Sequence, residues 1–264
     1  MVINPRSGSD SPSADELAAA AEKLGVEPHL LAEGEDPGAA ARASGAEILG
    51  MAGGDGSLAP VAQAALDTDA AFVCIPFGTR NHFARDLGLD RKDPLAALEA
   101  FAGGTERRVD VGRVADRLFL NNISFGAYAG LVHEREHHRR RGEALARARA
   151  IFKSVRHRHG LHARVNGEDI RARVLLIGNN RYDVDLFTLG MRERLNEGML
   201  QLWAAEGWLP TAWEEQVAAQ FRIEVPSGRV RAAIDGEPVL LDSPIELESL
   251  GQALRVLVPT GTEG

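Results

Sequence analysis

The amino-acid sequence predicts an α/β protein with an N-terminal three-layer α/β domain, built on a parallel sheet, and a C-terminal domain that is mainly β and sandwich-like. Two observations predict this fold. Residues 1–103 alternate short apolar runs with helical segments, whereas many short, turn-punctuated strand candidates follow from about residue 106. The length of 264 residues suits two modest domains, which we place at residues 1–104 and 105–264.

The first domain shows clear start and stop signals for its helices. Ser13 and Glu16 form a capping-box pattern before a helix that stops at Gly25, and Asp93–Pro94 begins a later helix. Strand alternating with helix implies a parallel sheet covered on both faces, with ligands beyond the carboxyl ends of the strands. The first apolar run belongs to a strand that is short unless further residues precede it. The predicted strands of this domain are residues 2–3, 29–31, 48–52 and 71–75, and its further helices are residues 37–44 and 58–66.

The second domain is predicted from a series of short strand candidates. A helical, basic insertion at about residues 127–157 interrupts them. Many short strands separated by turn residues are typical of a sandwich or a barrel. The candidates are residues 108–114, 118–124, 163–165, 171–177, 199–204, 221–225, 230–234, 238–241, 245–248 and 254–258.

Composition restricts the classes of function. The net charge of −8 argues against general affinity for nucleic acid. No apolar stretch is long enough to span a bilayer, and the first residues lack a signal-peptide pattern. The single cysteine, Cys74, lies in an apolar run, which favours a small buried side chain over a nucleophile and fits a reducing compartment. We therefore expect a cytoplasmic protein. Its oligomeric state, including a homodimer, stays open.

Charge is concentrated in one segment. Residues 133–159 hold nine Lys or Arg and three acidic residues, a net charge of +6. Leu145, Ala148, Phe152 and Val155 recur there at helical spacing with arginines between them. A basic amphipathic helix of this kind is typical of a membrane-surface element. An ordinary helix with a solvated charged face explains the pattern equally well.

Gly53–Ser57, with the sequence Gly-Gly-Asp-Gly-Ser, follows a predicted strand and precedes a helix. A phosphate at this point would meet free backbone amides and the positive end of the helix dipole. A carboxylate such as Asp55 among glycines is unusual in a simple turn. The Walker lysine is lacking, so this is not the common phosphate loop. The sequence therefore predicts that this loop binds a nucleotide phosphate.

Two further motifs carry polar side chains. Pro76–Asn81 comes directly after the next strand and offers Gly78, Thr79 and Asn81, with Arg80 or Arg85 available for a phosphate. Asp235-Gly236-Glu237 lies in the second domain, where Asp-Gly also favours a hairpin turn. Its functional interpretation is a carboxylate that takes a proton from a hydroxyl substrate.

Together with Asn4–Gly8, these motifs occur in an order and at a spacing that resemble the diacylglycerol kinase catalytic-domain family, over essentially the whole chain. That family includes sphingosine kinases and bacterial lipid kinases, and NAD kinases and phosphofructokinases are more distant relatives. The resemblance implies a NAD kinase/diacylglycerol kinase-like fold, ATP in the cleft between the domains, Mg²⁺ as cofactor, and phosphoryl transfer to a lipid hydroxyl. The second domain would close the cleft and bind the acceptor.

The resemblance also implies roles for individual residues. Glu237 matches the proton acceptor, with Asp235 beside it, and Asp55 would place magnesium and phosphates or act as a rival base. Glu197 stands where the family has a metal-binding aspartate, so it is the tentative metal residue. The nucleotide-binding residues would be Asn4, Pro5, Arg6, Ser7, Gly8, Gly53, Gly54, Asp55, Gly56, Ser57, Leu58, Ala59, Gly78, Thr79 and Asn81.

The chain departs from the family pattern at three places. Ser57 replaces threonine, Ala59–Pro60 replaces an Asn-Glu pair, and Glu197 is longer than aspartate by one methylene. We predict an ATP- and Mg²⁺-dependent kinase for diacylglycerol or a related lipid that visits the membrane peripherally. One alternative is a NAD kinase-like enzyme with a soluble acceptor, although that class expects Asn-Glu after the second loop and His82-Phe83 follows Asn81 here. The other is a non-catalytic nucleotide-binding regulatory module.

Overall fold

The computed structural model describes residues 1–8, 12–126, 160–182, 184–185, 188–205 and 213–262. The predicted basic insertion at residues 127–157 lies outside this part of the chain, so its helix and its membrane role stay predictions. The chain forms two compact units. Unit 1 is Met1–Val111, Met191–Gly198 and Leu250–Gly264, and unit 2 is Gly112–Gly190 and Met199–Ser249. The predicted domains meet at a single boundary after residue 104, whereas the chain returns twice to unit 1.

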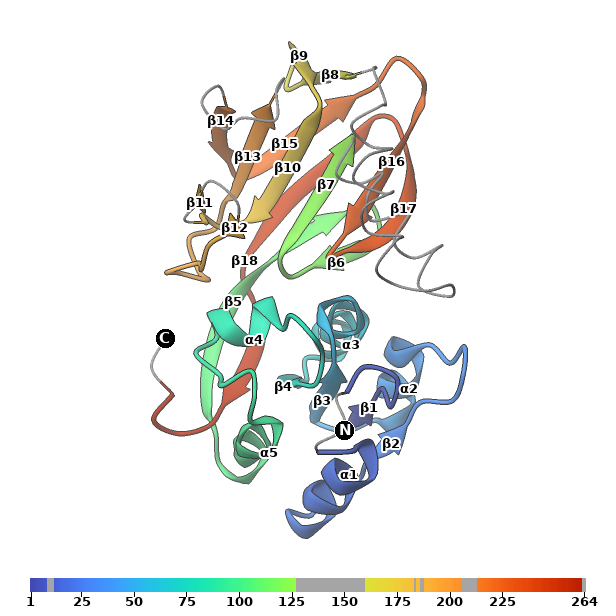
Figure 1. The fold of residues 1–264 in the computed structure, drawn as a ribbon, viewed down its shortest axis with the longest axis vertical. Coiled ribbons are helices and arrows are strands. Elements are labelled where there is room, and N and C mark those ends of the chain that lie inside the picture. Colours follow the sequence, from blue (N-terminus) through green and yellow to red (C-terminus); the bar gives the residue numbers. More distant parts are fainter. Residues whose placement is uncertain (9–11, 127–159, 183, 186–187, 206–212, 263–264) are drawn as a thin grey trace, which may run out of the picture. The chain divides into compact units, whose positions relative to one another are not determined.

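Unit 1 contains a parallel sheet in the order β2-β1-β3-β4-β18 (Figure 1). Its strands are β1 (Val2–Ile3), β2 (His29–Leu30), β3 (Ile48–Gly53), β4 (Ala71–Pro76) and the last part of β18 (Ile245–Val258), and β5 (Thr105–Val114) also pairs with β18. The helices are α1 (Ala14–Lys23), α2 (Pro37–Ser44), α3 (Asp55–Thr68), α4 (His82–Asp86), α5 (Pro94–Ala97) and the 3-10 helix η1 (Leu98–Ala102).

Helices α1 and α2 begin where the sequence predicts. The Ser13 side chain accepts a hydrogen bond from the Glu16 amide and the Glu16 side chain accepts one from the Ser13 amide, which completes the capping box of α1. Asp36 caps α2, and Gly45 ends it in the left-handed conformation. Helices α1 and α5 bury Leu17, Ala97 and other apolar side chains against one face of the sheet, while α2 and α3 pack together on the other. The predicted α/β architecture is confirmed.

Unit 2 is built from two packed antiparallel sheets. One has the order β14-β13-β10-β7-β16-β17, and the other joins the first part of β18 to β15, β8 and β9. Their facing side chains form one core that includes Phe125, Ile177, Phe221 and Leu247. The strands are β6 (Arg117–Phe119), β7 (Asn122–Gly126), β8 (Leu161–Val165), β9 (Glu168–Ala172), β10 (Val174–Asn179), β11 (Val184–Asp185), β12 (Thr188–Leu189), β13 (Leu200–Ala205), β14 (Trp213–Ala218), β15 (Gln220–Glu224), β16 (Arg229–Ile234) and β17 (Glu237–Asp242).

Four of the strand predictions are wrong in detail. Residues 118–124 form two strands, because the amides of residues 120–122 bind a buried carboxylate instead of a neighbouring strand. Residues 171–177 divide between β9 and β10, which belong to different sheets. Residues 245–258 form the single strand β18, which continues through the stretch where the apolar alternation stops and where Gln252 has a positive φ of 50°. Strand β14 was not predicted.

Cys74 is 2% exposed in the middle of β4, which agrees with its predicted place in the core. Burial raises the pKa of its thiol far above the ordinary value of 9.0, and the nearby charge of Asp55 raises it further. The unfolded chain therefore releases this proton more readily than the folded chain.

No helix in the described part of the chain is long and apolar enough to cross a membrane.

This shift predicts a pH dependence of stability. The contribution of Cys74 is complete well below pH 9 and is lost as the pH rises from the unfolded pKa towards the raised folded pKa, by about 1.4 kcal/mol per pH unit. Urea unfolding of the wild type and of Cys74→Ala at pH 8, 9 and 10 measures it. The difference in unfolding free energy between the two proteins should shrink above pH 9. A constant difference would contradict a fully buried thiol.

Candidate functional site

Three loops of unit 1 lie at the carboxyl ends of β1, β3 and β4, as predicted. The Asn4 amide donates to the carbonyl of Ala52 at 2.9 Å, and its side-chain Nδ2 donates to Ser57 Oγ at 3.3 Å. The Asn4 Oδ1 accepts from the Arg6 amide at 3.1 Å, which folds residues 4–8 into a turn. The first two predicted nucleotide-binding segments are therefore in direct contact.

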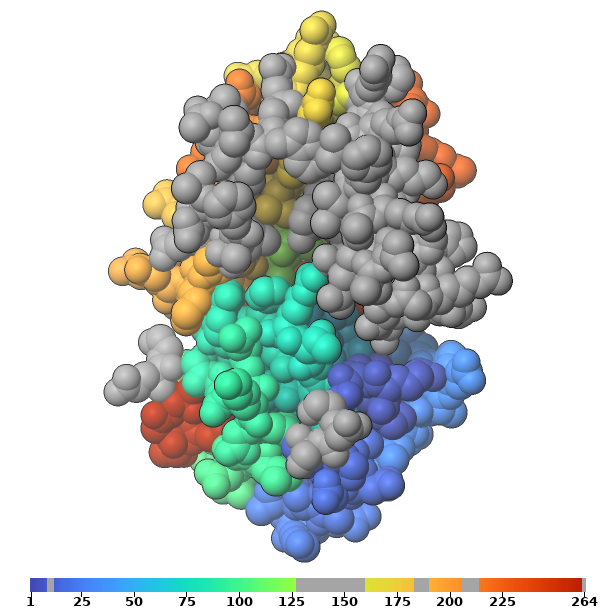
Figure 2. Space-filling model, in the orientation of Figure 1, coloured from blue at the N-terminus to red at the C-terminus, as the bar shows by residue number. Residues whose placement is uncertain are grey.

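Glycines allow the loops to approach one another. A Cβ atom at Gly78 would lie 2.5 Å from the Cα of Gly54, and one at Gly8 would lie 2.2 Å from the ring of Phe77. At Gly78 the backbone passes another backbone segment, and at Gly8 it passes an aromatic ring, with no room for a side chain at either glycine. Figure 2 shows the dark-blue N-terminal residues against the teal residues of this region of unit 1. The third loop is held against the other two.

Asp55 connects the first glycine loop to the helix after the second loop. Its carboxylate accepts hydrogen bonds from the amides of His82 at 3.2 Å and Phe83 at 3.1 Å, the first residues of α4. Asn81, which is 3% exposed, donates from Nδ2 to the Gly78 carbonyl at 2.8 Å. Burial lowers the pKa of the His82 imidazole, although Asp55 opposes the shift. Asp55 therefore helps to fix the geometry of both loops.

Helix α3 begins at Asp55, three residues before the predicted start, and runs through Pro60. Its N-cap, Gly54, makes no side-chain cap hydrogen bond, and the Ser57 amide donates to the Gly54 carbonyl at 2.9 Å. The positive end of the dipole of this 14-residue helix suits an anion. Leu58 and Ala59, predicted to line the nucleotide, have buried side chains. The unusual Pro60 is next to Gly38 of α2, where a Cβ would lie 2.8 Å from the Pro60 carbonyl oxygen. Pro60 therefore takes part in helix packing.

The close approach of Gly78 and Gly54 gives a testable prediction. Gly78→Ala should lower the unfolding free energy by about 1–3 kcal/mol, because its Cβ would push the two backbones apart. Gly54→Ala is the matched control, since its Cβ would lie 3.9 Å from the nearest atom, the Gly78 Cα. We expect that variant to lose less than about 1 kcal/mol. Urea denaturation measures both. Equal losses would show that the contact does not fix the loops.

The segment Met191–Gly198, which carries Glu197, belongs to unit 1. Asp110 accepts hydrogen bonds from the amides of Gly198 and Gln252, both at 2.6 Å, and donates its own amide to the Leu195 carbonyl at 2.7 Å. Near the other end of the segment, Arg192 forms an ion pair with Asp86 at 2.7 Å. The segment is held to unit 1 near both of its ends.

Magnesium requires hard oxygen ligands and in phosphoryl-transfer sites commonly uses one or two carboxylates together with substrate phosphates. Within the described ranges, no group of three His, Cys, Asp or Glu side chains gathers as a metal site. Asp55 and the half-buried Glu197 supply carboxylates of the required kind. These residues suit a Mg²⁺ ion that binds together with a nucleotide better than they suit a metal site formed by protein ligands alone.

In unit 2, Asp235 and Gly236 form the two-residue turn between β16 and β17, both with positive φ, so the predicted hairpin is present. The buried carboxylate of Asp235 accepts from the amides of Leu120 at 2.7 Å, Asn121 at 2.8 Å and Asn122 at 3.0 Å. Glu237, the first residue of β17, is exposed. Asp235 therefore ties the turn beside Glu237 to the 120–122 loop.

The carbonyl side of that loop is held by a second group of residues. Asn179 donates from Nδ2 to the Leu120 carbonyl at 3.3 Å, and the Tyr182 hydroxyl donates to the Asn121 carbonyl at 3.0 Å. The Tyr182 ring packs edge-on against Trp203, with ring centroids 6.1 Å apart. The loop is thus fixed on its amide side by Asp235 and on its carbonyl side by Asn179 and Tyr182.

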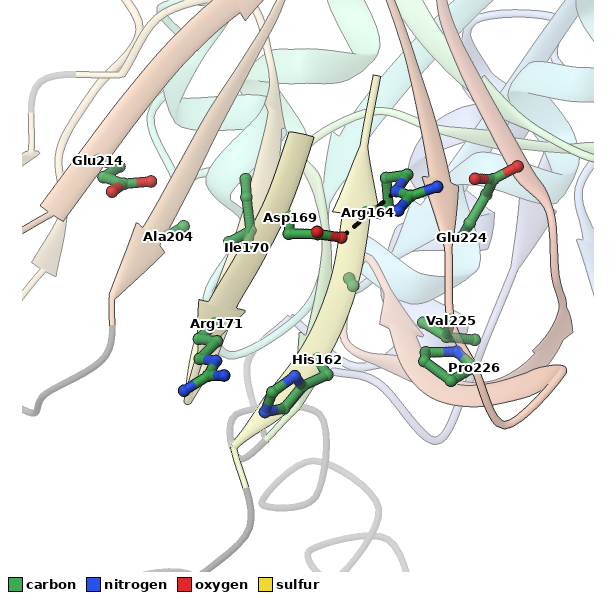
Figure 3. Close-up of a pocket in the computed structure, with 11 residues that line it drawn as sticks. His162, Arg164, Asp169, Ile170, Arg171, Ala204, Glu214, Glu224, Val225 and Pro226 are labelled. Atoms are coloured by element: carbon green, nitrogen blue, oxygen red, sulfur yellow. Dashed lines mark hydrogen bonds and ion pairs between the residues drawn. The ribbon is translucent and has the colours of Figure 1, made fainter. Parts of the chain in front are cut away.

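Unit 2 also contains a cavity of about 680 Å³ beside the β8–β9 hairpin (Figure 3). Its charged lining residues have both signs, and Arg164 pairs with Asp169 at 3.3 Å. None of the predicted site residues lines it. Its lining is His162, Ala163, Arg164, Asp169, Ile170, Arg171, Ala204, Glu214, Glu224, Val225 and Pro226. The mixed charge indicates no particular ligand.

Sequence reasoning missed three buried charged residues near the predicted site: Asp86, Asp110 and Arg192. Each lies in a stretch with several other charges, and a charged residue in such a stretch is usually solvated. Asp110 offered no signal, because Val109, Asp110 and Val111 alternate apolar and polar as in a half-exposed strand, whereas the structure buries both faces there.

Comparison with known proteins identifies the class. Residues 1–114 match the family described as "Diacylglycerol kinase catalytic domain". A protein of Pseudomonas aeruginosa named "Probable lipid kinase YegS-like" is 30% identical over 251 residues, which cover 84% of this chain and 80% of that protein. The chain therefore belongs to the diacylglycerol kinase catalytic-domain family, as the resemblance implied.

Other relatives match over shorter segments. The "Diacylglycerol kinase" of Bacillus subtilis is 36% identical over 90 residues, which cover 33% of this chain and 30% of that protein. The one from Mycobacterium tuberculosis is 33% identical over 101 residues, or 37% of this chain and 33% of that protein. The chain thus matches about a third of the length of these relatives. A crystal structure of a diacylglycerol kinase from Bacillus anthracis has the same fold, with a TM-score of 0.71, 17% identity, and coverage of 99% of this chain and 97% of that one.

Proposed function

We propose that this protein is a lipid kinase that transfers the γ-phosphate of ATP, with Mg²⁺, to a hydroxyl of diacylglycerol or a related lipid. The observation that carries the proposal is the convergence of Asn4–Gly8, Gly53–Ser57 and Gly78–Asn81 at one edge of the parallel sheet. The N-terminal end of α3, where Gly54 makes no side-chain cap hydrogen bond, suits a phosphate through the helix dipole. Family membership favours a lipid acceptor, because the relatives are named lipid or diacylglycerol kinases.

The protein residues contribute positioning and proton transfer. The backbone of the three loops would hold the nucleotide phosphates, and Asn4 with Ser57 would keep the first two loops together. Asp55 and Glu197 would hold Mg²⁺, which neutralises charge on the transferring phosphoryl group when it is bound. Glu237 would accept the proton of the lipid hydroxyl, and Asp235 would hold the turn beside it through its three amide partners.

A lipid acceptor requires contact with a membrane. The nine cations of residues 133–159 supply attraction to an anionic surface, worth about 1 kcal/mol for each Lys or Arg near the bilayer. We therefore propose peripheral binding through this segment. Flotation with vesicles containing anionic lipid should fall when salt is raised, and also when Arg139, Arg140 and Arg141 are changed to Gln. Binding that responds to neither change would contradict this role.

The proposed reaction is tested by measuring ADP release with Mg²⁺ and ATP in the presence of different acceptors. We expect release that depends on diacylglycerol or a related lipid in mixed micelles and that is absent with micelles alone. The soluble-acceptor alternative predicts release with NAD instead. Nucleotide binding without acceptor-dependent release for any lipid or for NAD would favour the non-catalytic alternative and contradict the kinase proposal.

A further inference from the structure

The strongest unexplained feature of unit 1 is a buried ion pair outside the sequence motifs. The side chains of Arg192 and Asp86 are both 0% exposed, and Arg192 Nε lies 2.7 Å from Asp86 Oδ2. The other carboxylate oxygen of Asp86 accepts from Arg85 at 2.7 and 2.9 Å. The Arg192 guanidinium carbon also lies 6.0 Å from the ring centroid of Phe83. A buried pair of this kind gives weak net stabilisation, and removal of Arg192 would leave the buried Asp86 carboxylate with Arg85 but without its contact to the 191–198 segment.

The pair joins two elements that carry predicted site residues. Asp86 is the last residue of α4, a helix of one turn whose first two amides bind the Asp55 carboxylate. Arg192 lies in the Met191–Gly198 segment, five residues before Glu197. Asp110 binds the same segment at Leu195 and Gly198. A continuous series of contacts therefore runs from Asp55 through α4 and Arg192 to the segment that carries Glu197.

We propose that Arg192 is a positioning residue: its buried pair with Asp86 sets the Met191–Gly198 segment and α4 relative to each other, and so sets the spacing of the Asp55 and Glu197 carboxylates. The consequence for magnesium and nucleotide depends on the proposed function. The expected loosening of α4 and of the Met191–Gly198 segment does not depend on that function, because it concerns contacts within the protein without ligands. Loss of Arg192 should loosen α4 and the segment together, since Asp86 would be left without its partner from the segment.

The test compares Arg192→Met, Arg192→Lys, the double variant Asp86→Asn/Arg192→Met and the control Arg107→Met. Arg107 is a matched arginine of unit 1, because it donates to the Leu87 carbonyl at 3.2 Å, just after α4, and to the Thr262 carbonyl, which lies outside Met191–Gly198. The double variant removes both charges, so it keeps a folded protein available for measurement if Arg192→Met alone unfolds.

Hydrogen exchange of the free protein is followed in peptides covering residues 78–89 and 191–198. We expect about tenfold faster exchange in both peptides for Arg192→Met and for the double variant, partial recovery for Arg192→Lys, and no change in residues 191–198 for Arg107→Met. Unchanged exchange in the Arg192 variants, or the same pattern in Arg107→Met, would overturn the proposal.

The second measurement is the Mg²⁺ concentration that gives half-maximal binding of a fluorescent ATP analogue. It should rise about tenfold in the double variant even though its melting temperature returns towards that of the wild type. Recovery of the Mg²⁺ requirement together with stability would show that the pair only stabilises the fold, and would overturn the proposal. If the wild type binds the analogue but phosphorylates no lipid, the proposed function fails while these two measurements still decide the role of Arg192.

Discussion

Glu237→Gln is expected to lower turnover of the lipid acceptor by about 10²–10⁴-fold while nucleotide affinity stays unchanged. Glutamine has nearly the shape of glutamate but cannot take a proton from the hydroxyl. Glu237 is exposed on β17, away from the core of unit 2, so the substitution should leave the melting temperature nearly unchanged. Steady-state rates and binding of a fluorescent ATP analogue measure the two effects separately.

Asp55→Asn is the informative comparison for this prediction. Asp55 accepts two amide hydrogen bonds from α4, so its replacement should weaken binding of the Mg²⁺–ATP complex as well as turnover. If Glu237→Gln turned over lipid at the wild-type rate while Asp55→Asn were inactive with normal nucleotide affinity, Asp55 would be the base and our assignment of Glu237 would be wrong.

Asp235→Ala is expected to lower the unfolding free energy by about 3 kcal/mol or more. The substitution leaves the amides of Leu120, Asn121 and Asn122 without their acceptor, and each buried donor that loses its partner costs about 1–3 kcal/mol. Part of this cost is avoided if water enters the site. Chemical denaturation of the purified variant measures the loss.

Two controls separate this effect from loss of charge. Asp235→Asn keeps one side-chain oxygen as an acceptor and should lose less than Asp235→Ala. Asp242→Asn removes a carboxylate from the exposed Arg229–Asp242 pair of the same hairpin, and we expect a change within about 0.5 kcal/mol. A loss for Asp235→Ala as small as that for Asp242→Asn would show that the carboxylate does not hold the 120–122 loop.

The sequence predicted the elements that local signals define. The capping box at Ser13 and Glu16, the helix at residues 37–44, and the Asp235–Gly236 turn are short-range patterns, and the structure contains all three. The glycine loops could also be predicted, because each directly follows a buried strand of a parallel sheet and must therefore lie at the same edge.

The long-range contacts could not be predicted in this way. The division of residues 118–124 into two strands depends on the carboxylate of Asp235, more than a hundred residues away, and no local pattern predicts it. Likewise, Arg192 and Asp86 are 106 residues apart, and each lies in a stretch of the sequence with several other charged residues, as solvated segments usually do. Burial of a charge is decided by the partner that the fold supplies, so such pairs appear only once the chain is folded.

The most direct test of the lipid-kinase proposal is a single-turnover reaction with γ-labelled ATP, Mg²⁺, excess protein and mixed micelles of diacylglycerol and related lipids, with NAD present in the same tube. After extraction, the account predicts label in the organic phase as a phosphorylated lipid, and much less with Glu237→Gln. Label recovered only in the aqueous phase, as phosphorylated NAD, inorganic phosphate or unreacted ATP, would contradict it.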